Sequence, residues 1–269
     1  MTTLNTIHGR QNRKGAKMEI IALMNQKGGV GKTTSAVNIG AGLGRIGRKV
    51  LLIDLDPQAH ATLSLGFPRE MTKTSYELLT GTMTAADVMT ARDGLTVIPS
   101  SLQLAGAEMQ LIGLPGREML LKSALAPIRA DFDYILIDCP PSIGVLTMNA
   151  LAAATAAFVP VMTEYLPTQG ISQLTETVDL IRTRLNPRLS IKGVFGTFYD
   201  SRRTVNREVM DHIRQTFGAA VFETVIRSNI ALSMAPGQGK TIFEYAPSSH
   251  GAADYLALCQ EIVSREGVK

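Results

Sequence analysis

Residues 25–34 read Asn-Gln-Lys-Gly-Gly-Val-Gly-Lys-Thr-Thr, and this stretch decides the fold. The residues before it, Glu19 to Met24, form a short and mostly apolar run, which is typical of a buried parallel strand. The residues after it are rich in glycine and alanine and carry spaced apolar side chains, so we expect a helix there. A glycine-rich loop between a strand and a helix is the setting that a phosphate-binding loop requires.

The residue types in this loop suit the binding of a nucleotide. Glycines let the backbone wrap closely around an anion, because no side chain blocks its approach. The loop amides can then point at a phosphate, with the dipole of the helix behind them. Lys32 would reach the β- and γ-phosphates, and the Thr33 hydroxyl would bind Mg²⁺. A glycine-rich turn without phosphate is the structural alternative. The predicted nucleotide contacts are Lys27, Gly28, Gly29, Val30, Gly31, Lys32, Thr33 and Thr34.

The loop departs from the common form G-x-x-x-x-G-K-[ST], because Gln26 stands at the first glycine position and a second lysine, Lys27, follows it. With K-G-G-V-G-K-T-T it resembles the deviant P-loop of the ParA/MinD family of ATPases, and the whole stretch is similar to the ParA form. In that family the extra lysine crosses a nucleotide-sandwich dimer to the partner's phosphates. The resemblance therefore implies catalytic roles for Lys27 in trans and for Lys32 in cis. A solvated loop lysine is the alternative for Lys27.

Two further strands are expected to end in carboxylates. The apolar run from Lys49 to Ile53 leads into Asp54-Leu-Asp56-Pro-Gln, and Tyr134-Ile-Leu-Ile leads into Asp138-Cys-Pro-Pro-Ser. In an open α/β sheet, ligands bind at the carboxyl ends of the strands. Both segments resemble the switch segments of the same family. The resemblance implies that Asp56 positions the attacking water, that Asp54 lies near Mg²⁺, and that Asp138 binds Mg²⁺ through water. The alternative is that Asp54 and Asp56 only cap a strand end.

The rest of the chain alternates between apolar runs and helical patterns. Its 269 residues are 45% hydrophobic and 19% charged, as in a soluble protein with a substantial core. We expect strands at 95–98, 156–161, 191–197 and 221–224, and helices at 75–79, 85–89, 102–111, 117–128, 168–185, 204–217, 230–234 and 252–265. This order predicts an α/β fold, with a mostly parallel twisted sheet flanked by helices on both faces. With its deviant Walker A loop, it resembles a P-loop NTPase.

The chain is expected to contain one domain and an arm. Residues 1–17 carry Arg10, Arg13, Lys14 and Lys17 and no acidic side chain, so we expect a disordered basic arm. A solvated tail, or a true start at Met18, is the alternative. Residues 18–269 contain no linker rich in Pro, Gly or Ser, and we expect a single ParA-like ATPase domain.

Basic residues in the second half of the chain suggest contact with DNA. The segment Phe198-Tyr-Asp-Ser-Arg202-Arg203 resembles the family's tyrosine–aspartate–x–arginine, so the resemblance implies a DNA contact for Arg202, and Arg203 adjoins it. In the following family motif, two arginines are replaced here by Ser228 and Ala231, while Arg227 occupies a proline position. We expect Arg227 to take over from the missing arginine. Contacts of this kind are made to phosphates and carry no sequence preference. A solvated surface is the alternative.

The resemblance extends over nearly the whole chain and implies an ATPase that partitions chromosomes or plasmids. With ATP and Mg²⁺ it would form a homodimer, bind nucleoid DNA, and leave it when a ParB-like adaptor stimulates an otherwise slow hydrolysis. The net charge of +4 permits contact with a polyanion. The chain would then be cytoplasmic, nucleoid-associated and free of membrane.

Three other functions remain open on sequence grounds. A ParA-like ATPase could position a protein cargo instead of DNA. A MinD-like membrane ATPase needs a basic amphipathic helix at its end, whereas residues 261–269 are short and mixed in sign. An iron–sulfur protein on this scaffold needs a second cysteine near the switch region, and Cys139 and Cys259 lie far apart in sequence. We therefore expect Cys139 to be a core residue.

Overall fold

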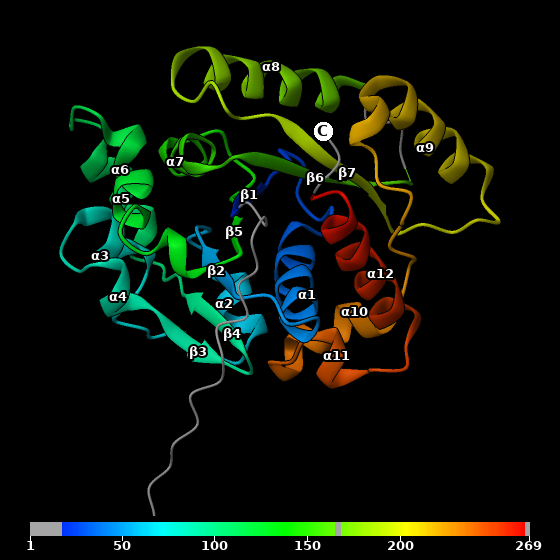
Figure 1. Cartoon of the computed structure of the whole chain (residues 1–269), viewed down its shortest axis with the longest axis horizontal. Helices are drawn as coiled ribbons and strands as arrows, with labels where there is room; N and C mark the ends of the chain where they lie inside the picture. The colour runs from blue at the N-terminus through cyan, green and yellow to red at the C-terminus, as the bar shows by residue number, and fades with distance from the viewer. Residues whose placement is uncertain (1–17, 165–167, 267–269) are drawn as a thin grey trace, which may run out of the picture.

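The computed structural model describes residues 18–164 and 168–266, so the predicted arm at 1–17 lies outside the described residues. The described residues form a seven-stranded sheet in the order β3-β4-β2-β5-β1-β6-β7 (Figure 1). All neighbouring strands pair in parallel except β3 and β4. The strands are β1 Glu19–Leu23, β2 Val50–Asp54, β3 Thr90–Arg92, β4 Leu95–Ile98, β5 Tyr134–Asp138, β6 Ala156–Met162 and β7 Ile191–Thr197.

Helices cover both faces of the sheet, because alternate strand residues bury their side chains on opposite sides. Ile20 and Ala22 of β1 belong to one hydrophobic cluster, and Ile21 and Leu23 belong to the other. The first cluster packs against α3 Ser75–Thr80, α4 Ala85–Val88, α5 Leu104–Leu111, α6 Leu120–Leu125, α7 Val145–Ala153, α8 Thr168–Arg184 and α9 Thr204–Phe217. The second packs against α1 Lys32–Arg45, α2 His60–Ser64, α10 Ile230–Met234, α11 Ile242–Tyr245 and α12 His250–Ser264. In Figure 1, α8 and α9 lie on one side of β6 and β7, and α1 and α12 lie on the other. The predicted fold class is therefore confirmed.

The register of the central strands brings three loops to the same edge of the sheet. Leu23 of β1 and Asp54 of β2 both pair with Asp138 of β5. The glycine-rich loop after β1 therefore begins beside the two carboxylates that end β2 and β5. This edge is where ligands bind in an open parallel sheet.

Some predicted elements differ from those in the structure. The strand predicted at 221–224 is wrong, because Val221 makes only an isolated bridge to Val194. The backbone amides of Glu223 and Thr224 donate instead to the carboxylate of Glu261, at 2.9 Å each, so they do not extend the ladder. The helix predicted at 117–128 is shorter, since a 3₁₀ turn at Arg117–Met119 precedes α6 and α6 ends at Leu125. Pro127 has no amide hydrogen, so the helical hydrogen-bond pattern does not continue through it.

A hairpin and three helices of the described residues were not predicted from the sequence. Strand β3 pairs antiparallel with β4 through a turn at Asp93 and Gly94, whose φ values are 47° and 80°. Asp-Gly is a common signal for such a turn, but it lies in a polar region without apolar alternation. The helices that were not predicted are α2, α7 and α11, which have five, nine and four residues. Among the described helices, none combines the length and the apolar composition needed to cross a membrane.

Candidate nucleotide site

The glycine-rich loop has the backbone of an anion-binding loop. Gly29 and Gly31 have φ values of 75° and 88°, in the left-handed region that favours glycine. The side chain of Asn25 fixes the loop, since its Oδ1 accepts from the amide of Lys27 (3.0 Å) and its Nδ2 donates to the carbonyl of Pro160 (2.9 Å). Helix α1 begins at Lys32 with Gly31 as its N-cap residue, which has no side chain to cap the first amides. Those amides can therefore donate to an anion.

Lys32 is a buried cation at the base of the loop. Its side chain is buried, and its Nζ donates to the carbonyl of Lys27 at 3.2 Å. Burial lowers the pKa of Lys32, and the nearby carboxylate of Asp138 partly opposes that effect. A buried lysine that shares a loop with helix amides is placed to neutralise phosphate charge.

Asp54 is fully buried and holds the loop that follows it. Its Oδ1 accepts from the amide of Asp56 at 3.1 Å, and its Oδ2 accepts from the amide and hydroxyl of Thr62 at 2.9 and 2.8 Å. Burial raises the pKa of Asp54 to about 6, although these hydrogen bonds act in the opposite direction. Its oxygens are thus already engaged, and the magnesium contact predicted for Asp54 stays a prediction.

Asp138 is also fully buried, but its oxygens have no such partners. Neither oxygen accepts a hydrogen bond of normal geometry from the described residues. Burial and then the neighbouring Asp54 raise the pKa of Asp138 well above its ordinary value, while the nearby Thr33 hydroxyl and Lys32 lower it. A buried carboxylate that accepts no hydrogen bond from the protein is explained if it binds a cation. Carboxylate and hydroxyl oxygens are hard ligands that suit Mg²⁺, so Thr33 and Asp138 fit this ion.

The other two predicted catalytic residues lie beside these groups. Asp56 is buried, and its Oδ1 accepts from the amide of Gln58 at 2.9 Å. Its backbone carbonyl accepts from the Ser100 hydroxyl at 2.8 Å, which fixes the start of the loop leading to α2. Lys27 lies at the exposed tip of the glycine-rich loop. The structure thus brings Lys27, Lys32 and the three aspartates to one edge of the sheet.

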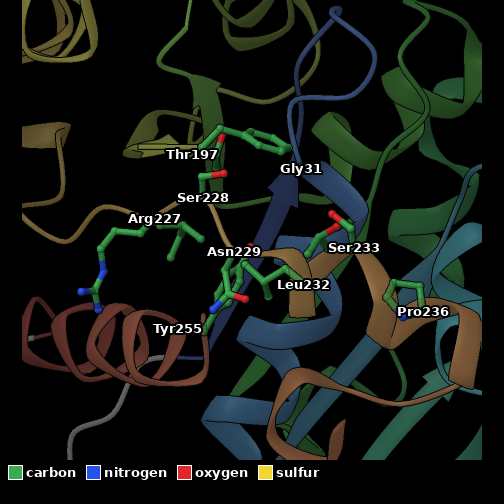
Figure 2. Close-up of a pocket in the computed structure, with 12 residues that line it drawn as sticks. Gly31, Thr197, Arg227, Ser228, Asn229, Leu232, Ser233, Pro236 and Tyr255 are labelled. Carbon is green, nitrogen blue, oxygen red and sulfur yellow. The ribbon is translucent and has the colours of Figure 1, made fainter. Parts of the chain in front are cut away.

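A cavity of about 210 Å³ adjoins the loop at Gly31 (Figure 2). Its walls come from four distant parts of the chain, which are Gly31 and Thr34, Thr197 and Phe198, residues between Ile226 and Pro236, and Tyr255 on α12. Asn229 supports this wall, because its Oδ1 accepts from the amide of Ala231 at 2.8 Å and so caps α10. Sequence analysis did not find Thr197, Phe198 or Tyr255, because no motif or spacing relates them to the loop.

The three predicted DNA-contacting arginines lie on adjacent backbone segments. Arg202 donates from Nε and Nη2 to Asp200 at 3.0 and 2.8 Å, and 88% of its side chain is exposed. These bonds lower the pKa of Asp200 to about 2. Arg203 pairs with Glu164 at 3.0 Å. Arg227 is joined to this region by the bridge between Tyr199 and Arg227, but its guanidinium is bound by the buried Asp254, at 2.6 Å from Nη2. A contact of Arg227 with DNA stays a prediction.

The two cysteines belong to the core. Cys139 and Cys259 are buried in hydrophobic clusters on opposite faces of the sheet. Burial raises the pKa of both thiols. Two thiols on opposite faces of the sheet cannot both bind the same iron–sulfur cluster within one subunit.

Comparison with known proteins places this site in a family. A family model described as an AAA domain matches residues 18–191. The sporulation initiation inhibitor protein Soj of Bacillus subtilis is 45% identical over 91% of this chain and 98% of its own length. The chromosome partitioning protein ParA of Myxococcus xanthus is 42% identical over 97% of this chain and 94% of its own length.

Solved structures agree with this assignment. A cobyrinic acid a,c-diamide synthase from Mycobacterium smegmatis, with bound ATP analogue and magnesium, has a TM-score of 0.82 and 36% identity over 93% of this chain and 96% of its own. The cell division ATPase MinD of Pyrococcus furiosus has a TM-score of 0.73 and 26% identity over 92% of this chain and 99% of its own. The chain therefore belongs to the ParA/MinD family of deviant P-loop ATPases and, within it, is similar to the ParA and Soj partitioning proteins.

Proposed function

We propose that this protein is a DNA-partitioning ATPase that binds ATP with Mg²⁺, dimerises around the nucleotide and binds DNA without sequence preference. A ParB-like adaptor then stimulates hydrolysis and releases the protein from the nucleoid in the cytoplasm. The observation that carries the nucleotide part is the buried Asp138 carboxylate beside the glycine-rich loop, whose oxygens accept no hydrogen bond of normal geometry from the part of the chain that the structure describes. The partitioning part rests on the Soj and ParA relatives, which share 45% and 42% identity with this chain.

The nucleotide would occupy the loop and the adjoining cavity. The amides of Gly29 to Thr33 and the ammonium of Lys32 would bind the phosphates, and the base would enter the cavity beside Gly31 and Thr34. Thr33 and Asp138 would hold Mg²⁺, and Asp54, which is paired with Asp138 across the strands, would lie near the ion. When bound, the ion neutralises charge that develops on the phosphates. The Mycobacterium smegmatis neighbour, whose structure contains an ATP analogue and magnesium, supports this proposal.

Hydrolysis would depend on two residues with different tasks. Asp56 would orient the attacking water, and its buried loop fixes it near the end of β2. Lys27 lies at the exposed tip of the loop, where a second subunit could be reached. In the dimer it would contact the phosphates bound by the partner subunit, as a cationic finger supplied in trans.

A groove beside the loop, lined by two large apolar and four polar side chains, supports a dimer. The side chains of Ile143, in the loop after β5, and Leu180, on α8, are exposed although both are large and apolar. Together with Gln26 they line a groove next to the glycine-rich loop. Covering these side chains would add hydrophobic stabilisation to the nucleotide-mediated contact. The second copy of the chain is the occupant that this proposal assigns to the groove.

The DNA surface would be formed by Arg202 and Arg203 at the start of α9, with Arg227 beside them. Exposed guanidinium groups bind phosphate oxygens well. A dimer would present two such surfaces, which strengthens binding to a long duplex.

The proposal is tested by comparing Lys32→Ala with the unaltered protein. Without the Lys32 ammonium, calorimetry should show loss of ATP binding, and no ATP-dependent binding to unrelated duplexes should remain. Liposomes serve as the control surface, since a MinD-like protein would bind them instead. Normal ATP hydrolysis by Lys32→Ala would contradict the nucleotide assignment. If the unaltered protein binds ATP but no duplex, only the DNA part of the proposal is contradicted.

A further inference from the structure

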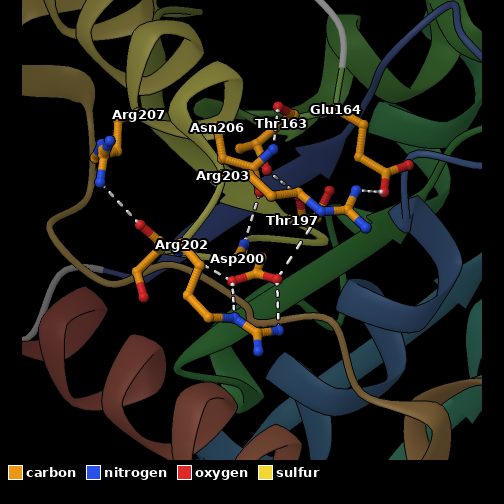
Figure 3. A network of polar contacts seen from close by, with 9 residues as sticks. Thr163, Glu164, Thr197, Asp200, Arg202, Arg203, Asn206 and Arg207 are labelled. Carbon is orange, nitrogen blue, oxygen red and sulfur yellow. Dashed lines mark hydrogen bonds and ion pairs between the residues drawn. The ribbon is translucent and has the colours of Figure 1, made fainter.

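Hydrogen bonds connect the glycine-rich loop to the arginines at the start of α9, and Figure 3 shows the part of this network from Thr163 and Thr197 to Arg202 and Arg203. The first link is the Thr197 hydroxyl, which donates to the carbonyl of Val30 at 2.9 Å. Because a peptide group is planar, this bond also fixes the orientation of the Gly31 amide in the glycine-rich loop. The next link is Thr163, whose amide and hydroxyl both donate to the carbonyl of Thr197 at 3.0 Å. The loop is thus joined to the ends of β6 and β7.

Asn206 continues the connection to the arginines. This side chain is 1% exposed, and its Nδ2 donates to the carbonyl of Thr163 at 2.9 Å. Its Oδ1 accepts from the amide of Asp200 at 2.6 Å, and the Asp200 carboxylate in turn binds Arg202. Asn206 therefore uses both ends of its amide to hold the turn from Asp200 to Arg203 against the end of β6.

The residue between these links has a strained backbone. The backbone φ of Phe198 is 54°, a value that bulky residues, unlike glycine, rarely adopt. Thr197 before it is held by the bonds described above. Tyr199 after it is also fixed, because its amide donates to the carbonyl of Ile226 and its carbonyl accepts from the amide of Ser228, at 3.1 Å each. Such strain persists where the surrounding contacts over-determine it. We therefore expect that a displacement of the glycine-rich loop or of the cavity wall would also displace the turn from Asp200 to Arg203.

We propose that Thr197 and Asn206 are positioning residues, which couple nucleotide binding at the glycine-rich loop to the geometry of the Arg202 turn within one subunit. The proposal rests on the proposed function, since it concerns the nucleotide and DNA sites assigned above. Phosphate binding fixes the Val30–Gly31 peptide, Thr197 transmits its position to Thr163, and Asn206 transmits it to Asp200. Coupling of this kind is reciprocal, so DNA at Arg202 should tighten nucleotide binding by the same factor.

The first experiment measures the connection without DNA and without ATP-driven dimers. Amide hydrogen exchange is followed by mass spectrometry with and without ADP and Mg²⁺, in the unaltered protein and in two variants. Thr197→Val removes the hydroxyl donor at nearly constant shape, and Thr197→Ser keeps it. We expect ADP to slow exchange in the loop of all three proteins. Exchange in residues 198–203 should slow only in the unaltered protein and in Thr197→Ser.

The outcomes separate this proposal from the proposed function. Absence of protection in the glycine-rich loop itself would show that no nucleotide binds there, and both would fall. Protection of the loop without protection of residues 198–203 in the unaltered protein would overturn only the coupling. Equal protection of residues 198–203 in Thr197→Val would also overturn it, because the hydroxyl would then be dispensable.

The second experiment measures coupling as a ratio of DNA affinities. Fluorescence anisotropy gives the affinity for an unrelated duplex with and without a non-hydrolysable ATP analogue, while sizing checks that each variant still dimerises. Allosteric coupling typically changes affinity about 5- to 150-fold. We expect this ratio to fall towards one in Thr197→Val and in Asn206→Ala, and to recover in Thr197→Ser. A dimeric Thr197→Val protein with the ratio of the unaltered protein would contradict the proposal. If the unaltered protein binds no duplex, the DNA function falls, and the exchange experiment alone decides the coupling.

Discussion

Asp54 and Asp138 are directly paired across β2 and β5, yet their carboxylates have opposite surroundings. The oxygens of Asp54 accept three hydrogen bonds, from the amide of Asp56 and from the amide and hydroxyl of Thr62. Those of Asp138 accept no hydrogen bond of normal geometry from the described residues. The Asp54 carboxylate therefore holds the following loop, whereas we propose that the Asp138 carboxylate binds a cation.

The first prediction separates these two roles. Asp138→Asn should lower nucleotide affinity at least about tenfold with Mg²⁺ and change it little with a chelator, since only the ion contact is weakened. Asp54→Asn should instead reduce the free energy of unfolding by roughly 1–3 kcal/mol, because buried donors lose an acceptor. Calorimetry and thermal unfolding measure the two effects. An Asp138→Asn protein with unchanged affinity in Mg²⁺ would contradict the assignment.

The second prediction concerns pH in the absence of nucleotide and Mg²⁺. Burial raises the pKa of Asp54 from 3.8 to about 6 and raises the pKa of Asp138 as well. The folded chain then holds more protons than the unfolded chain, so the contribution of these groups to stability falls as pH rises from about 4 to about 6. In Asp138→Asn this fall should be smaller. Thermal unfolding in chelator across that range measures it, and parallel curves for the two proteins would show that Asp138 does not contribute.

The third prediction divides dimerisation from hydrolysis. Asp56→Ala should bind ATP and remain dimeric but lose turnover, because only the carboxylate that orients water is removed. Lys27→Ala should lose both properties, since its target lies on the other subunit. A cation supplied in trans can contribute roughly 10³–10⁵ in rate. Sizing with ATP, beside a phosphate-release assay, distinguishes the variants, and a monomeric Asp56→Ala protein would refute this division of roles.

The fourth prediction tests the arginine surface. Arg202→Ala should weaken binding to all duplexes alike and leave basal ATP hydrolysis largely unchanged. Arg214→Ala is the matched control, because Arg214 is also exposed and lies at the opposite end of α9. Each phosphate contact contributes about −0.9 to the slope of log affinity against log salt. Titrations at several salt concentrations should therefore show a shallower slope for Arg202→Ala only. Equal losses in both variants would argue for a diffuse electrostatic effect.

The fifth prediction concerns Arg227, whose side chain is 45% exposed and bonded to Asp254. Arg227→Ala should lower the free energy of unfolding by roughly 1–3 kcal/mol, because it leaves the buried Asp254 carboxylate unpaired. If Arg227 also contacts DNA, Arg227→Lys should restore part of the DNA affinity but less of the stability, since an ammonium cannot make the bidentate contact. Unfolding and anisotropy measurements on the same samples compare the two losses. Unchanged DNA affinity in Arg227→Ala would confine Arg227 to the structural role.

Local sequence was sufficient for the phosphate loop and for the central strands. Glycine permits the positive φ found at Gly29 and Gly31, and a short apolar run such as 134–138 is typical of a buried strand in a parallel sheet. The same runs end in Asp54 and Asp138, so their meeting at one edge follows from parallel pairing. These features could be predicted because each depends on neighbouring residues or on a repeating pattern.

Tertiary structure alone decided which polar groups from distant parts of the chain form hydrogen bonds with each other. The Thr197 hydroxyl reaches Val30 across 167 residues, and no periodicity in the sequence relates the two. The amides at 223 and 224 donate to Glu261 instead of to a strand, and Arg227 binds Asp254, because α12 packs beside those segments. Asp54 and Asp138 end similar strands, yet only Asp54 has Thr62 within reach. A hydrogen bond depends on distances between distant segments, and only the packed fold sets those distances.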